Sequence, residues 1–279
     1  MVTRRDMIGL AAAGLACNAL DSSGAITRSA LALRGAMMGW GKKKSYSASD
    51  YLLPSAFCIL DAIENMGPLE HSNSCNRWYD FATSSAETNS TIGGTYTWDD
   101  KSFIPSAYWA AANMFRFRQD IINGDSRFAD GYTHETVVAF DKSPLDSQTS
   151  TWRSISLGLL SNSNGPTYIE NLRGGTNRIV AKTNDAVFYN TAPEADVYAN
   201  SVHTFSAVTT TSSYRLFIDG EQVWSIEGSY TFNPIANKLG NYAALSLGSK
   251  FSSIRLYSSA LSADDIKRNF EIDKARFNI

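Results

Sequence analysis

Cysteine is scarce in this sequence, and its three copies, Cys17, Cys58 and Cys75, lie far apart. The sequence contains no Cys-x-x-Cys pair, which excludes the common zinc-site and thioredoxin-like patterns. A disulfide between Cys58 and Cys75 stays open if the protein is exported, because sequence alone cannot place two Cα atoms within bridging distance.

Charge of either sign is also low. Charged residues make up 19% of the chain, below the fraction of about a quarter that is usual in globular proteins. The balance of 25 basic and 27 acidic residues gives a formal net charge of −2. A nucleic-acid-binding domain typically carries a basic stripe, so the composition predicts no nucleic-acid partner.

The sequence lacks a long apolar run of the kind that spans a membrane. The uncharged stretch Met7–Leu20 is short and rich in Ala and Gly, whereas a transmembrane helix needs about 20 mostly apolar residues. Arg4–Arg5 before this stretch and Ala30-x-Ala32 after it resemble a twin-arginine export signal with a signal-peptidase site. Alternatively, residues 1–44 form an uncleaved, Ala-rich helical arm that packs on a neighbouring protein.

Motifs that mark common enzyme classes are missing as well. The sequence contains no nucleophile elbow, phosphate loop or His-Glu-x-x-His helix. Its three histidines, His71, His134 and His203, are scattered singly, and we interpret each as an ordinary strand or loop residue. Serine is abundant, but no pattern in the sequence links a serine to a histidine and an acid.

The sequence does contain the pattern of apolar and polar segments that is typical of a β domain. Over residues 45–279, short apolar runs alternate with clusters of Ser, Thr, Asn and Gly. Runs such as Ala56–Ile63, Arg77–Thr83 and Thr133–Asp141 have the length and composition of strands. No repeat or proline-rich linker divides this part of the chain. We therefore expect one all-β domain over residues 45–279, preceded by the N-terminal segment of residues 1–44.

Two local signals predict a turn and a helix cap. Asp219–Gly220 lies between two apolar runs, and this dipeptide favours a type I′ hairpin turn, in which both central residues have positive φ. Near the C-terminus, Ser262 has the position of an N-cap and Asp265 that of its capping-box partner. Ile266 and Phe270 would give the helix that follows one apolar stripe for docking.

Three segments carry a family resemblance. Residues 202–223 (VHTFSAVTTTSSYRLFIDGEQV) are similar to two paired strands in which Trp-His precedes Leu-Tyr-x-Asp-Gly, although Val202 stands in the Trp place. Residues 247–273 (LGSKFSSIRLYSSALSADDIKRNFEID) are similar to a closing strand and helix, and residues 60–83 to an opening segment. The chain thus resembles laminin-G-like domains of the concanavalin A-like lectin/glucanase class, of the kind found in bacterial surface and phage-associated proteins.

The resemblance implies an all-β fold, a two-sheet antiparallel jelly-roll sandwich of the concanavalin A-like type. It would carry a short C-terminal helix, with the helical arm or signal segment at the N-terminus. The final strand should lie beside the first, and the helix should cover an edge or an end of the sandwich. The closing segment is then a structural element and not a chemical site.

Hydrolases of this class place two carboxylates against one sugar. These carboxylates come from a Glu-x-Asp-x-x-Glu motif on one strand, where alternate side chains lie on the same face. The nearest matches, residues 194–199 (EADVYA) and 271–276 (EIDKAR), both lack the final Glu. We therefore expect that the chain is not an enzyme, and glycoside hydrolysis is the weaker alternative.

Glycan-binding members of this class use exposed aromatic rings, on which the apolar face of a sugar stacks. The resemblance implies five candidate ligand-binding residues in loops: Trp98, Tyr108, Trp109, Tyr189 and Tyr230. Many members also hold a structural calcium through loop oxygens, and the candidate ligands are Asp120, Asp125 and Asp130. None of these acids has a fixed calcium spacing, so solvated loop carboxylates are the simpler interpretation.

The resulting hypothesis is an extracellular, non-catalytic recognition domain that binds a glycan or another cell-surface ligand through its loops. The alternative is a structural component of a phage virion, such as a tail, fibre or decoration protein, that uses the jelly roll for assembly or host attachment. In that case the N-terminal arm would contact virion proteins or join copies of the chain into a homo-oligomer.

Overall fold

The computed structural model describes residues 45–74, 78–84, 96–105, 115–116, 126–139, 153–156, 168–171, 177–183, 186–189, 201–227, 238–239 and 250–279. The chain divides into two compact units, Met1–Ser45 and Tyr46–Ile279, and the elements described below belong to the second. The predicted export signal or arm lies outside the described residues. Cys58 is buried in the first strand, whereas Cys75 lies outside the described residues, so the question of a disulfide between them stays open.

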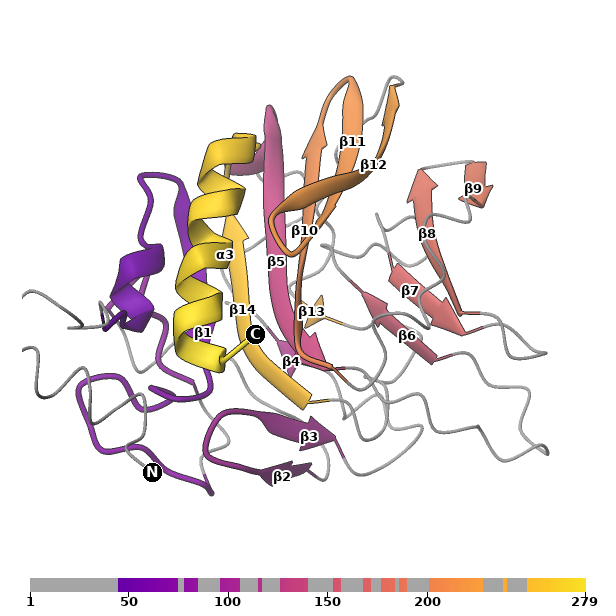
Figure 1. Ribbon diagram of the computed structural model, residues 1–279. Helices are drawn as coiled ribbons and strands as arrows, with labels where there is room; N and C mark the ends of the chain where they lie inside the picture. The colour runs from indigo at the N-terminus through magenta and orange to yellow at the C-terminus, as the bar shows by residue number, and fades with distance from the viewer. Residues whose placement is uncertain are drawn as a thin grey trace, which may run out of the picture. The chain divides into compact units, whose positions relative to one another are not determined.

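Most described strands belong to one antiparallel sheet of eight strands (Figure 1). Its order is β12, β11, β10, β5, β14, β3 and β2, and β1 also pairs with β14. The strands are β1 (Ala56–Asp61), β2 (Tyr96–Trp98), β3 (Phe103–Pro105), β5 (Gly131–Ala139), β10 (His203–Thr210), β11 (Ser213–Ile218), β12 (Glu221–Glu227) and β14 (Lys250–Tyr257).

Two smaller sheets and three helical segments complete the described elements. One sheet joins, in sequence order, β6 (Arg153–Ser156), β7 (Tyr168–Asn171), β8 (Asn177–Thr183) and β9 (Ala186–Tyr189). The other pairs β4 (Phe115–Arg116) with β13 (Lys238–Leu239). The helical segments are the 3-10 turns η1 (Ala48–Tyr51) and η2 (Ser126–Phe128) and the α-helix α3 (Ala263–Phe277). The predicted antiparallel all-β architecture with a C-terminal helix is confirmed.

The central strands of the main sheet are buried on both faces. Every residue of β5 is buried, including the polar Thr133 and Glu135, and β14 is buried from Phe251 to Tyr257. A strand covered on both sides does not show a clean alternation of apolar and polar residues. Its buried polar side chains need hydrogen-bond partners within the protein, and these partners come from neighbouring strands, from the loop before α3 and from α3 itself.

The predicted hairpin turn is confirmed. Asp219 and Gly220 have φ angles of 52° and 80°, the left-handed values that a type I′ turn requires at both central positions. The turn joins β11 to β12, and Ile218 pairs with Glu221 directly across it. Asp219 tolerates this backbone conformation because Asp and Asn are among the few residues that adopt it readily.

The closing strand and helix also have the predicted local structure. β14 pairs with β1, with Ile254 opposite Leu60, so the final strand lies beside the first. At the start of α3, the Ser262 hydroxyl oxygen accepts the backbone N–H of Asp265 at 3.1 Å, and the capping box is complete. The described helices include none that is long and apolar enough to cross a membrane.

The position of α3 corrects one expectation. The helix does not cover an edge or an end; it lies along a face of the main sheet, over β14 and β5 (Figure 1). Its buried face holds Ile266 and Ile272 but also the polar Asn269, Asp273 and Arg276, while Phe270 is only partly buried. The expected apolar stripe is therefore only part of the docking surface, since the polar strand residues beneath the helix require polar partners.

The strand predicted at residues 77–83 is wrong for the described part of that segment. Only Asp80 makes a single bridge, and a turn follows it. The carboxylate of Asp80 accepts the backbone N–H groups of Ile59 and Ala82, each at 2.9 Å. This local competition for backbone donors folds the segment into a turn beside β1.

Candidate functional site

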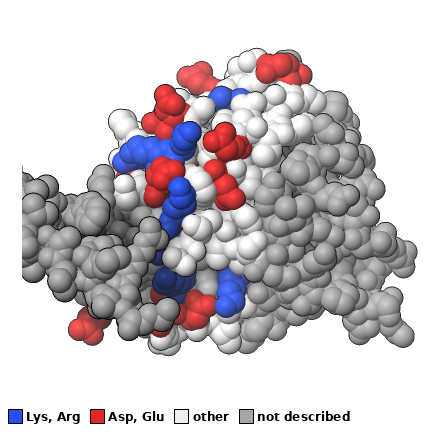
Figure 2. Space-filling view, viewed as in Figure 1, with Lys and Arg blue, Asp and Glu red and all other residues white. Residues whose placement is uncertain are grey.

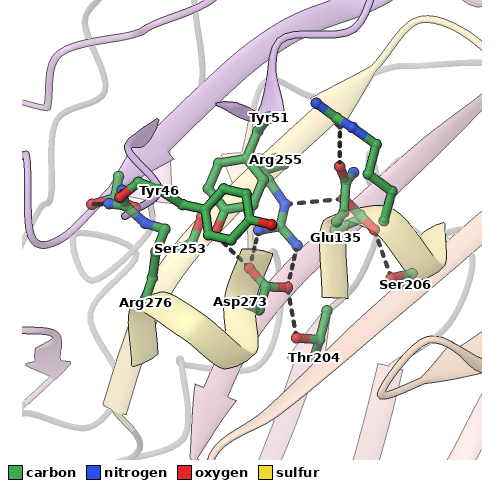
Figure 3. A network of polar contacts seen from close by, with 12 residues as sticks. Tyr46, Tyr51, Glu135, Thr204, Ser206, Ser253, Arg255, Asp273 and Arg276 are labelled. Carbon is green, nitrogen blue, oxygen red and sulfur yellow. Dashed lines mark hydrogen bonds and ion pairs between the residues drawn. The ribbon is translucent and has the colours of Figure 1, made fainter. Parts of the chain in front are cut away.

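A cluster of buried charges joins α3 to the sheet beneath it (Figure 3). Arg255 of β14 donates two hydrogen bonds to Asp273 of α3, at 2.6 and 2.8 Å, and a third to Glu135 of β5 at 3.0 Å. All three side chains are 0% exposed. The planar guanidinium thus lies between two carboxylates, an arrangement that suits the fixed fork of its donors.

Neutral side chains satisfy the remaining oxygens of the two acids. Asp273 accepts hydrogen bonds from the Tyr51 hydroxyl at 2.6 Å and the Thr204 hydroxyl at 2.7 Å. The other carboxylate accepts from Ser206 at 2.9 Å and from the Asn269 amide at 2.7 Å. Buried charges are tolerated when they are paired and hydrogen-bonded in this way.

The electrostatics of the cluster follow from its burial. Burial raises the pKa of Glu135, and the charge of Arg255 only partly opposes this shift. Burial alone would lower the pKa of Arg255, but the charges of Asp273 and Glu135 outweigh it and raise that pKa. Because these groups are sealed from solvent and bridged by one cation, the two acids do not form an accessible carboxylate pair for a sugar. We assign the cluster a structural role.

A second set of charges fixes the C-terminal turn of α3. Arg276 donates to the backbone oxygen of Tyr46 at 2.9 Å and to Glu64 at 2.7 Å, and its other terminal nitrogen lies 2.8 Å from Asp61. Burial raises the pKa of Asp61, and the charge of Arg276 acts against this rise. These contacts hold the next residue, Phe277, against the sheet, where its side chain lines a groove.

This groove has a volume of about 390 Å³ and lies between the turn that joins β2 to β3, the start of β14 and the end of α3. We name it the Asp99–Lys250 groove. Its lining residues are Asp99, Asp100, Lys101, Ser102, Val202, Lys250, Ser252 and Phe277. The volume is within the range of small-molecule sites, which is roughly 300–1,000 Å³.

Asp99 organises the polar side of the groove. One of its carboxylate oxygens accepts the backbone N–H groups of Lys101 at 2.9 Å and Ser102 at 2.7 Å, which fixes the turn between β2 and β3. The other oxygen lies 3.4 Å from the Lys250 ammonium. Partial burial alone would raise the pKa of Asp99, but these hydrogen bonds outweigh it and lower that pKa. The carboxylate is therefore held ionised as an acceptor.

The groove can bind a hydroxyl-rich ligand that carries little net charge. Asp99 and Asp100 offer acceptors, Lys101 and Lys250 offer donors, and the two signs balance. Val202 and Phe277 add an apolar surface. On the described part of the face in Figure 2, acidic and basic side chains are interspersed, so it presents no single-sign field that would attract a polyanion.

The residues predicted to bind ligand or metal are only partly within the described chain. Trp98 ends β2 next to Asp99, is partly exposed and packs against the buried Trp78, with ring centroids 5.3 Å apart. Tyr189 ends β9, and Asp130 is exposed after η2. The remaining candidates, Tyr108, Trp109, Tyr230, Asp120 and Asp125, lie outside the described residues. Within the described ranges, no group of three or more His, Cys, Asp or Glu residues could hold a metal ion.

Sequence reasoning did not identify the groove, although one signal was present. The segment Trp98–Ser102 contains an acid followed three residues later by Ser, a common pattern for a carboxylate that caps its own turn. Nothing in the sequence indicates that Lys250 returns to this turn, because 151 residues separate it from Asp99.

The comparisons with known proteins identify the fold. No protein-family model matches the sequence, and no curated protein matches it. The structure resembles the ligand-binding domain of Botulinum neurotoxin serotype D in complex with N-acetylneuraminic acid, with a TM-score of 0.51 and 12% identity over 81% of this chain and 52% of that one. The chain has a β-sandwich fold.

Two further solved structures support the same fold. The binding domain of Botulinum neurotoxin DC in complex with rat synaptotagmin II has a TM-score of 0.51 and 11% identity, covering 81% of this chain and 52% of that one. The Botulinum neurotoxin type G receptor-binding domain has a TM-score of 0.50 and 12% identity, covering 78% of this chain and 51% of that one. The chain therefore spans about half the length of these neighbours, 51–52% of each.

Proposed function

We propose that this domain is a recognition module that binds a glycan in the Asp99–Lys250 groove without hydrolysing it. The observation that carries the proposal is the composition of this groove: balanced carboxylates and ammonium groups beside an apolar surface formed by Val202 and Phe277. A sugar ring presents hydroxyls at its rim and C–H groups on its faces, so it matches both kinds of lining.

The fold gives independent support. One structural neighbour is a ligand-binding domain in complex with N-acetylneuraminic acid, a sugar, and another is a receptor-binding domain. At 11–12% identity these likenesses concern the fold, which hosts many functions. The groove supplies the chemistry that the fold alone does not. We further propose that the domain belongs to the laminin-G-like group and acts outside the cell.

A glycan-array assay on the full chain, run with calcium and with EDTA, tests this proposal. We expect reproducible binding to one sugar class. K250A and D99N should each weaken it by about tenfold or more, because each removes a charged hydrogen-bonding partner of the ligand. K274A is the matched control, since Lys274 is an exposed lysine of α3 outside the groove, and its ammonium contacts Glu271 and the ring of Phe270.

Two results would argue against a glycan site in the groove. A well-folded chain that binds no array sugar would exclude the proposed function and would favour a protein ligand or assembly into a virion. Equal binding by K250A, D99N and the unmodified chain would mean that the sugar binds elsewhere on the domain.

A further inference from the structure

A serine, a histidine and an aspartate are linked in order where β10 begins, at residues 201, 203 and 219. The Ser201 hydroxyl oxygen lies 2.7 Å from Nε2 of His203, and Nδ1 of the same ring lies 2.6 Å from the Asp219 carboxylate. The sequence shows no such pattern, because the antiparallel pairing of β10 with β11, with Phe205 opposite Ile218, is needed to return Asp219 to the start of β10. The groove proposed above does not include these side chains.

The hydrogen-bond partners fix the roles of the two ring nitrogens. An ionised carboxylate only accepts hydrogen bonds, so Nδ1 of His203 must be the donor to Asp219. In a neutral imidazole the other nitrogen then carries no proton, so Nε2 accepts a hydrogen bond from the Ser201 hydroxyl. This is the tautomer that a general base requires: a base beside the nucleophile, oriented by a third group.

The acid is held rigidly behind the histidine. Its second carboxylate oxygen accepts the backbone N–H of Thr204 at 3.0 Å, and its own backbone N–H donates to the Thr204 oxygen at 2.9 Å. Asp219 is also fixed by its place in the type I′ turn, with φ of 52°. The ring of His203 packs edge-on against Phe205. The base is therefore positioned by regular β structure.

The nucleophile is accessible from solvent. Ser201 is exposed, and the side chains of His203 and Asp219 are 17% and 27% exposed. Val202, which lies between Ser201 and His203 in sequence, lines the Asp99–Lys250 groove, whereas Ser201 and His203 do not.

We propose that Ser201 is an activated nucleophile that takes an acyl group from a carboxylic ester. Its oxygen attacks the ester carbonyl carbon while its proton passes to Nε2 of His203, and Asp219 stabilises the imidazolium that forms. The ester C–O bond then breaks, and the proton moves from His203 to the departing alkoxide. The products are an acyl-Ser201 ester and a free alcohol, so atoms and charge balance.

A fluorophosphonate, which reacts with activated serines in place of an ester, tests the proposal on the full chain at about pH 8. The new bond joins the Ser201 oxygen to phosphorus, and fluoride leaves with the serine proton. We expect peptide mass spectrometry to find the adduct at Ser201. The labelling rate should fall to background in S201A and by on the order of 100-fold in H203Q, which is a typical contribution of a general base.

D219N keeps the experiment decisive if a His203 variant folds poorly. Asn also suits a type I′ turn and can still accept the Thr204 N–H, but its uncharged amide does not stabilise an imidazolium. S212A removes another exposed serine and is the matched control, which should label like the unmodified chain.

Labelling of Ser201 no faster than that of other exposed serines, or an unchanged rate in both D219N and H203Q, would overturn the proposal. Glycan binding by S201A should be unchanged, which separates this test from that of the groove.

Discussion

At the scale of single residues, Arg255 holds the buried charges of β5 and α3 together. It is the only cation that hydrogen-bonds the two fully buried acids, Glu135 and Asp273, in the described cluster. Its guanidinium also lies over the ring of Tyr51, with Cζ 4.2 Å from the ring centroid. A lysine could not replace these contacts, because a point-like ammonium lacks the planar fork.

Replacing Arg255 with methionine should destabilise the fold severely. R255M keeps a long side chain but leaves two buried carboxylates without their cation, and breaking a buried pair in this way costs about 3–5 kcal/mol. Urea unfolding of the full chain measures the change. K274M is the control, because the ion pair of Lys274 with Glu271 is exposed and should contribute less than about 1 kcal/mol. A loss in R255M no larger than in K274M would contradict a structural role for the cluster.

Local signals in the sequence were sufficient for single caps and turns. Ser262, Asp265 and Asp219–Gly220 have the predicted roles because each acts on backbone groups within a few residues. The role of Arg255 was not predictable in this way. It depends on Glu135, which is 120 residues away, and on a helix that places Asp273 above both.

At the scale of elements, the hairpin turn and the closing helix touch each other. A Cβ atom added to Gly220 would lie 3.0 Å from Cδ1 of Phe270 in α3, closer than side chains normally approach. The turn therefore needs glycine for two reasons, its positive φ and the closeness of the helix. Phe270, which the sequence suggested as part of an apolar stripe, thus contacts the hairpin.

G220A should lower the free energy of unfolding through both effects. A left-handed backbone costs an alanine about 1–2 kcal/mol, and the contact with Phe270 adds to this cost. In a double-mutant cycle by urea unfolding, F270A should relieve the contact but not the backbone strain. The destabilisation by G220A should then be smaller in the F270A background. Identical costs in both backgrounds would show that the turn and the helix do not press on each other.

At the scale of the whole molecule, the sequence predicted the architecture better than the chemistry. Strand-like runs, the Asp219–Gly220 turn and the closing segment pointed to an antiparallel β-sandwich with a terminal helix, which the structure and its neighbours confirm. Both proposed sites instead join segments far apart in the sequence, such as Asp99 with Lys250 and His203 with Asp219. Spacing along the chain cannot reveal such contacts, because register and helix docking decide them.

The buried Glu135 should also make the stability of the whole domain depend on pH. The unfolded-state pKa of a glutamate is near 4.5, and burial raises the folded-state pKa of Glu135 above this value. Between the two pKa values the folded state binds more protons than the unfolded state, so stability decreases as pH rises. The stabilisation from this group is therefore complete below about pH 4.5 and is lost as pH rises through the folded-state pKa.

E135Q isolates this contribution, because its amide can still accept from Arg255 but does not titrate. Urea unfolding of both proteins from about pH 4 to about pH 8 should show the advantage of the unmodified chain over E135Q shrinking as pH rises. E271Q, which removes an exposed glutamate of α3, controls for the loss of one negative charge. An advantage that grows with pH would mean that Arg255 outweighs burial and lowers the pKa of Glu135. The buried cluster would then stabilise the domain as a fully ionised network, and the acid-side stability predicted here would be absent.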